Sequence, residues 1–305
     1  MNRTLAAAVL AFCGTALLTV PARAQGGGTE TPTLYELTAH APVVIAAQVV
    51  SGQVKLAQIK VDEVFRGNVQ KGQKLQIAFR DFNLDLGRQT RITFTDGEID
   101  LLFLTPELDY YGKPKGPDRY TLHRGRFGKQ PLPREGEEIY RDAVREFAAL
   151  AAEKDHRKLY GQIRSLVGNP NPLLVDAGLH EILRLDLMDR DLLPGVLSYL
   201  NDPSPRRRIQ ALRLIEELFT DLKPADRSPE LEDEALQPVI VVARNDADEE
   251  TRVRAVDTMA AWGGEEVTRA LKAIAELDTA QAVRYQAQVR LLRSDQNNKT
   301  SSPGP

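Results

Sequence analysis

A turn that recurs in the C-terminal half constrains the fold of this chain more than any other feature. Its clearest copy lies in the stretch Asn201-Asp-Pro-Ser-Pro-Arg-Arg-Arg-Ile-Gln-Ala-Leu-Arg-Leu-Ile215. An apolar run from Leu192 to Leu200 stops there at Asp202-Pro203. A second run then carries apolar residues from Ile209 to Leu218 at the three-residue spacing of one helix face. The pattern predicts two helices joined by a short turn.

The same turn is found at four places, and at each of them similar residues follow it at the same distances. The residues that we take as its anchors are Gly168, Asp202, Asp246 and Asp278, at intervals of 34, 44 and 32 residues. Nine residues after each anchor stands an alanine, namely Ala177, Ala211, Ala255 and Ala287. Six residues after three of the anchors stands an arginine, namely Arg208, Arg252 and Arg284. Because a small residue lets two helices approach closely, this register predicts stacked helical hairpins.

These residues resemble the HEAT repeat, whose mark is a turn aspartate followed by a valine or isoleucine and a basic residue on the second helix. Asp202 with Arg208 and Asp246 with Arg252-Val253 match best, whereas the copy at Gly168 has neither the aspartate nor the arginine. The resemblance covers about 140 residues. It implies an all-α HEAT-type solenoid over residues 159–293. In that family the arginine usually bonds to the turn of the neighbouring repeat.

Residues 34–132 follow a different pattern, with short alternating apolar segments that are typical of β-strands. We expect strands at residues 43–52, 56–65, 74–79, 91–95, 98–104, 119–122 and 126–130. Asp96-Gly97 predicts a tight turn that pairs the strands on its two sides. Short strands at this density predict a small antiparallel β-barrel.

The order of these elements resembles a bacterial oligonucleotide/oligosaccharide-binding (OB) type of barrel, which is similar to the inhibitory domain of tissue inhibitors of metalloproteinases. The resemblance is carried by the helix-like Leu34-Tyr-Glu-Leu37, the strand end Val64-Phe-Arg-Gly67 and the strand Glu98 to Leu104. Those inhibitors act through an N-terminal cysteine and are held by disulfides, whereas Cys13 is the only cysteine here. The resemblance therefore implies an OB-like fold and no inhibitory residue.

Together the two halves predict an α+β protein in two domains. The first is the small OB-like antiparallel barrel at residues 34–132, and the second is the HEAT-type solenoid at residues 159–293. A bridging helix within residues 133–158 is expected to connect them. Residues 294–305 contain no apolar side chain apart from prolines, which predicts a disordered tail.

The first 24 residues have the pattern of a secretory signal peptide. A charged start at Arg3, an apolar run from Leu5 to Val20 and the ending Ala22-Arg-Ala24 predict cleavage after Ala24. The alternative is a membrane anchor, but the run of about 16 residues is shorter than the ~20 that span a bilayer. We expect an exported chain, periplasmic or extracellular, with no transmembrane segment after cleavage and a flexible leader over residues 25–33.

Composition excludes most kinds of site chemistry. Because Cys13 lies in the expected signal peptide, the mature chain would have no thiol for disulfides, metal sites or catalysis. The four histidines are scattered singly, and no nucleophile elbow, phosphate loop or dinucleotide fingerprint is present. The net charge of −3 includes +3 in residues 34–132 and −7 in residues 133–305, which argues against nucleic acid as a partner. We expect no enzyme activity, metal or cofactor.

Four residues are candidate partner contacts. Arg206 and Arg207 precede the repeat arginine Arg208, and they form either an anion-binding patch or a solvated face. Tyr110 and Tyr111 lie in a loop by composition. They form either a binding tip, because loop tyrosines make contact area at small entropic cost, or a pair half buried against the barrel.

These features favour an exported, non-enzymatic scaffold that holds another exported or envelope protein on the surface of its solenoid. A second hypothesis is a barrel that binds a glycan or a peptide, with the solenoid as a spacer. A third is an enzyme of an unfamiliar type. The sequence leaves the oligomeric state and the identity of the partner open.

Overall fold

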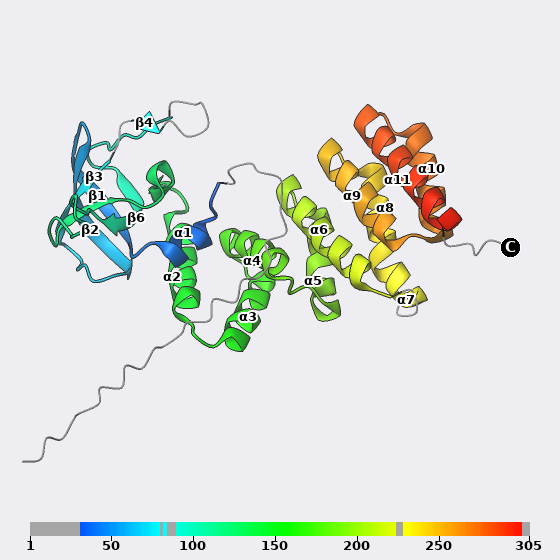
Figure 1. Ribbon diagram of the computed structural model, residues 1–305, viewed down its shortest axis with the longest axis horizontal. Helices are drawn as coiled ribbons and strands as arrows, with labels where there is room; N and C mark the ends of the chain where they lie inside the picture. The colour runs from blue at the N-terminus through cyan, green and yellow to red at the C-terminus, as the bar shows by residue number, and fades with distance from the viewer. Residues whose placement is uncertain (1–30, 80–81, 84–89, 224–227, 301–305) are drawn as a thin grey trace, which may run out of the picture. The chain divides into compact units, whose positions relative to one another are not determined.

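The computed structural model describes residues 31–79, 82–83, 90–223 and 228–300 (Figure 1). The expected signal peptide and the leader through residue 30 lie outside these ranges. The described chain consists of a closed β-barrel followed by helices, which confirms the predicted α+β class in two parts. Within the described residues, no helix combines the length and the apolar character needed to span a bilayer.

Five strands close the barrel. They are β1 (Val43–Gln53), β2 (Leu56–Arg66), β3 (Lys74–Ala78), β6 (Ile99–Pro106) and β7 (Arg119–Leu122). Their order is β1-β2-β3-β7-β6, and β1 also pairs with β6. The pair β3–β7 is parallel and the others are antiparallel, so the barrel is mixed rather than wholly antiparallel as expected. A ring with an odd number of strands cannot alternate direction throughout, so at least one pair must be parallel.

The predicted hairpin around Asp96-Gly97 is wrong, although its turn forms. The Glu98 amide donates to the Thr95 carbonyl at 3.0 Å, and Gly97 has a φ of +82°. The turn packs on β1, because the Asp96 carboxylate accepts from the Gly52 amide at 2.8 Å. The described partners of β6 are β1, β7 and β8 (Lys129–Pro131), while β4 (Phe82–Asn83) pairs with β5 (Thr90–Arg91).

Apolar residues at alternate strand positions fill the barrel, among them Ile45, Val49, Ile59, Leu75, Ile77, Leu102 and Leu104. The opposite face of β6 carries Leu101 and Phe103, which pack outward against two helices. These helices are α1 (Leu34–His40) and α2 (Glu137–Ala152). Thr33 and Glu36 form a capping box that fixes the start of α1.

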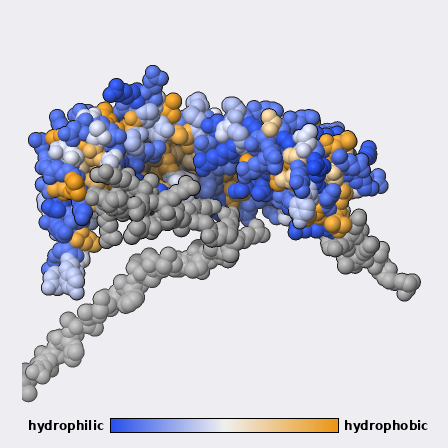
Figure 2. Space-filling model, turned by 90° about the horizontal axis from the view of Figure 1, so that it is seen from above, coloured by the Kyte–Doolittle hydropathy of each residue, from blue (hydrophilic) through white to orange (hydrophobic). Residues whose placement is uncertain are grey.

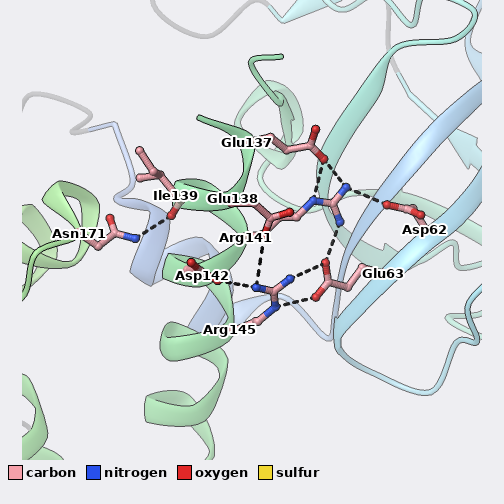
Figure 3. A network of polar contacts seen from close by, with 9 residues as sticks. All are labelled: Asp62, Glu63, Glu137, Glu138, Ile139, Arg141, Asp142, Arg145 and Asn171. Atoms are coloured by element: carbon pink, nitrogen blue, oxygen red, sulfur yellow. Dashed lines mark hydrogen bonds and ion pairs between the residues drawn. The ribbon is translucent and has the colours of Figure 1, made fainter. Parts of the chain in front are cut away.

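Helix α2 contacts both the barrel and the helices that follow (Figure 3). Its buried Arg141 donates to Glu63 of β2 at 2.7 Å and to Asp62 at 2.8 Å, and it also bonds to Glu137 of its own first turn. On the other side, the Asn171 side chain donates to the Ile139 carbonyl at 2.8 Å. Helix α2 therefore bonds to β2 through Arg141 and to Asn171 through the Ile139 carbonyl.

The remaining helices surround one large apolar core. They are α3 (His156–Ser165), α4 (Pro172–Leu185), α5 (Leu193–Ser198), α6 (Pro205–Asp221), α7 (Pro229–Leu231), α8 (Gln237–Asn245), α9 (Glu249–Trp262), α10 (Gly264–Leu277) and α11 (Gln281–Thr300). The expected disordered tail is wrong over residues 294–300, which continue α11. Once a helix has formed, each further hydrogen bond requires only one more residue to be ordered, so extension is easier than nucleation. No proline interrupts the chain before Pro303. Residues 301–305 lie outside the described part of the chain.

Four turns of identical bonding precede α4, α6, α9 and α11. In each, the side-chain Oδ1 of the anchor accepts the backbone N–H two residues later, and the helix begins at the third residue. The anchors are Asn169, Asp202, Asp246 and Asp278. The first anchor is therefore Asn169 and not Gly168, because asparagine supplies the same accepting oxygen as aspartate. This one-residue shift makes Gly178, rather than Ala177, the counterpart of Ala211, Ala255 and Ala287.

The shifted register predicts opposite effects for two glycine-to-alanine changes. In Gly178→Ala the new Cβ would lie 2.7 Å from the Leu166 Cβ, and overpacking of this kind costs about 1–3 kcal/mol. In Gly161→Ala, in α3, the new Cβ meets nothing within 4 Å and the helix gains up to about 1 kcal/mol. We expect chemical denaturation to give a lower free energy of unfolding for the first variant and a higher one for the second. Equal stabilisation by both changes would contradict close packing at Gly178.

The bridging helix offers a second matched pair. Arg141→Ala leaves the carboxylates of Glu63, Glu137 and Asp62 facing one another without their shared cation, at an expected cost of about 3 kcal/mol. Arg145 bonds to the same Glu63, but its side chain is 45% exposed, so Arg145→Ala should cost less than about 1 kcal/mol. Urea denaturation of the full-length chain measures both changes. Similar losses for the two variants would show that burial of Arg141 is not what matters.

Candidate functional site

The two tyrosines lie at the tip of a bonded loop between β6 and β7. We call residues 107–118 the tyrosine loop. Tyr110 is 96% exposed and Tyr111 is 82% exposed, and their rings meet edge to face at a centroid distance of 5.4 Å. The hypothesis that they pack half buried against the barrel is therefore wrong. Their amphipathic rings face solvent as a pair.

Bonds within the tyrosine loop hold this tip in place. Asp109 accepts from the amides of Tyr111 and Lys113, both at 2.9 Å. At the base, Glu107 bonds to Lys115 at 2.6 Å and to Arg119 at 2.9 Å. The hydrogen bond from Lys115 lowers the pKa of Glu107, and that from Arg119 adds to the effect against the opposing influence of burial. The loop is thus an ordered hairpin that ends in two exposed aromatic rings.

The two candidate arginines differ in availability. Arg206 is exposed, and no ion pair reaches it within the described residues. Arg207 donates to Asp176 of α4 at 2.6 Å and lies 3.0 Å from Asp202, with only 19% of its side chain exposed. Arg207 thus joins α4 to the turn before α6, and its role as a partner contact stays a prediction, as does that of Arg206. No described contact joins either arginine to Tyr110 or Tyr111.

The arginine at the sixth position links successive turns. Nη1 of Arg208 donates to the Asp202 carbonyl at 2.7 Å, and Nη2 donates to Oδ1 of Asp246 in the next turn at 2.9 Å. Arg252 repeats this arrangement, with 2.8 Å to the Asp246 carbonyl and 3.0 Å from Nε to Asp278. We call this series the arginine ladder. Each of these two guanidinium groups thus joins its own turn to the turn that follows.

A buried carboxylate lies in the barrel, where the sequence analysis named no site. By strand alternation Asp100 shares a face with Leu102 and Leu104, and Lys129 lies 2.8 Å from its Oδ1. Burial raises the pKa of Asp100 to about 6, and the ion pair with Lys129 only partly offsets this effect. The signal was visible as an acidic residue at an inward position of an apolar strand. Both side chains are almost fully buried, so the pair is closed to a substrate.

The described residues contain no group of three or more histidine, cysteine, aspartate or glutamate side chains placed to hold a metal ion. His123 has its Nδ1 3.1 Å from the Thr105 hydroxyl, and burial, helped by Arg124 and His40, lowers its pKa. Within the described residues no group bonds to Nε2 of His123, so nothing orients the ring as the base of a nucleophile and base pair. What the described surface offers is contact area at the tyrosine loop, since the ladder side chains of Arg208 and Arg252 are only 12% and 11% exposed and already bind aspartates.

The adjacent arginines give a sharp test of these assignments. Arg207→Glu would place a third carboxylate beside Asp176 and Asp202, and it should lower the free energy of unfolding by about 1–3 kcal/mol. Arg206→Glu should change it by less than about 0.5 kcal/mol, as exposed substitutions usually do. Thermal unfolding of the two full-length variants measures the difference. A mild effect at both positions would mean that the Arg207 ion pairs contribute nothing to stability.

Comparison with known proteins identifies no protein similar to this chain. No protein-family model matches this chain, no curated protein matches it, and no solved structure matches it. The assignment of a function therefore depends on the contacts and exposures of its own residues.

Proposed function

We propose that this protein is an exported, non-enzymatic adaptor that binds another exported or envelope protein, and that Tyr110 and Tyr111 make the decisive contact. The observation that carries the proposal is the exposure of both rings, 96% and 82%, on a loop held by its own hydrogen bonds. Tyrosine is among the residues that most often dominate binding energy at protein interfaces. A loop that is already ordered loses little further entropy when it binds.

In this proposal the helices form a HEAT-type solenoid that carries the recognition domain. Support comes from the four identical turns and from the ladder bonds that join Arg208 to Asp246 and Arg252 to Asp278. A solenoid of stacked hairpins offers an extended surface for a second contact. The OB-type assignment of the barrel is likewise part of the proposal, and it is supported by closure with five strands.

A second candidate function uses the same tyrosines. A barrel that binds a glycan or a peptide would place the ligand against the exposed rings, because aromatic faces offer apolar contact and hydroxyl groups at once. The tyrosine loop also carries the exposed Lys113 near its tip, and Lys115 at its base. The two functions differ in what the tyrosines touch, so one set of variants distinguishes them.

The test uses the full-length exported protein with a photo-crosslinking amino acid at Lys113. We expect a covalent adduct with another protein in the parent chain and at least a tenfold weaker one in Tyr110→Ser/Tyr111→Ser, because hot-spot aromatics contribute about 2 kcal/mol or more each. Val54→Ser is the matched control, since Val54 is 72% exposed on the turn between β1 and β2. All three chains should unfold at similar temperatures.

An adduct of equal yield in the double variant would remove the tyrosines from the interface and overturn the proposal. Binding to an immobilised glycan series that is lost in the double variant, with no protein adduct in the parent chain, would instead establish the second function.

Mass spectrometry of the exported chain tests the export step separately. An intact N-terminus would contradict cleavage after Ala24.

A further inference from the structure

The last turn of the helical region ends the arginine ladder in an incomplete form. Nη1 of Arg284 donates to the Asp278 carbonyl at 2.7 Å and to the Thr279 carbonyl at 3.1 Å. Arg208 and Arg252 make the same inner pair of bonds six and five residues back. Their remaining nitrogens, Nε and Nη2, hold the aspartate of the next turn. Within the described residues nothing bonds to Nε or Nη2 of Arg284.

The inner bonds of Arg284 therefore present an oriented guanidinium edge. In the two completed steps this edge binds a carboxylate through two nitrogens, with distances of 2.8 to 3.2 Å. Such forked pairs are strong and directional, because the planar guanidinium matches the geometry of a carboxylate. By analogy with Arg208 and Arg252, the group that fits Nε and Nη2 of Arg284 is an aspartate carboxylate.

Apolar side chains beside Arg284 are exposed in a way that the earlier turns avoid. Tyr285 is 64% exposed, whereas Ile209 and Val253 at the same position of their turns are half buried. Leu292 lies two helical turns further along the same face of α11 and is also 64% exposed. Figure 2 shows hydrophobic residues at the surface of this last part of the chain, at the right of the view.

The stacking of the helices explains this exposure. Helix α9 packs against α6 on one side and α11 on the other, whereas α11 packs against α9 and α10 and is the last described helix. We call Arg284, Tyr285 and Leu292 the terminal surface. It presents a cation and two apolar side chains where a further helical pair would stack.

A second copy of this chain does not supply the missing carboxylate. Asp202 already pairs with Arg207, Asp246 with Arg208, and Asp278 with Arg252. The first turn has Asn169 at the anchor position and so offers no carboxylate. Two copies of α11 set face to face would also bring their Arg284 side chains together without a carboxylate from either helix, since the first acidic residue of α11 is Asp295.

We infer that the terminal surface docks a helical hairpin of another protein, with an aspartate in the turn of that hairpin bound by Nε and Nη2 of Arg284. The apolar residues of the incoming hairpin cover Tyr285 and Leu292. This site is separate from the tyrosine loop, so it stands or falls independently of the proposed function.

The probe is a synthetic peptide with the sequence of residues 264–293, which carries Asp278 in the turn between two helices, its helicity checked by circular dichroism. When the labelled peptide is titrated with the full-length protein, its fluorescence anisotropy should increase and reach a plateau. Asp278→Asn in the peptide, or Arg284→Gln in the protein, should weaken binding about tenfold or more, since each removes one partner of a charged pair. Arg269→Gln, at an exposed position of α10, should leave the affinity unchanged.

Three results would overturn the inference. The first is no binding of the parent peptide, and the second is equal affinity for the parent and the Asp278→Asn peptide. The third is a dimer of the protein alone, seen by sedimentation equilibrium and abolished by Arg284→Gln, which would assign the terminal surface to a second copy.

Discussion

The carboxamide or carboxylate that accepts the backbone N–H two residues later is the interaction on which the helical region depends. It fixes where α4, α6, α9 and α11 begin. In three of the four turns the same side chain also binds an arginine. Because one Asp246 side chain binds both its own backbone and Arg208, the start of a helix and its contact with the preceding turn form together. Asn169 can do only the first of these two tasks.

A buried guanidinium has the corresponding role between the barrel and the helices. Arg141 binds carboxylates from β2 and from its own helix (Figure 3). Apolar residues of α2 pack against α4. Burial raises the pKa of the shared Glu63, but hydrogen bonds from Arg145 and Arg141 outweigh it and keep the pKa below its ordinary value. This contribution to stability is therefore present above the ordinary pKa and is lost as the pH falls through the folded one.

The sequence predicted the barrel, the helices and the ladder arginines, because each depends on local pattern. Alternation in residues 43–52 and 56–65 marked strands that the structure places within one residue or so of the expected ends. The parallel pair β3–β7 was missed although the odd number of strands in the ring requires one. The first anchor was misplaced by one residue because an alanine, Ala177, stands nine residues after Gly168, whereas the residue nine positions after the true anchor Asn169 is Gly178. The ion pair of Arg207 with Asp176 was missed because the two residues lie 31 positions apart in the sequence.

Val175 occupies the ladder position of the first turn, so no arginine reaches from there to Asp202. The ion pair that joins α6 to α4 is instead that of Arg207 with Asp176, whose side chains are 19% and 31% exposed. The next step uses Arg208 and Asp246, exposed by only 12% and 8%. Since dissolved ions screen exposed charges more than buried ones, mechanical compliance should concentrate between α4 and α6 and should increase with ionic strength.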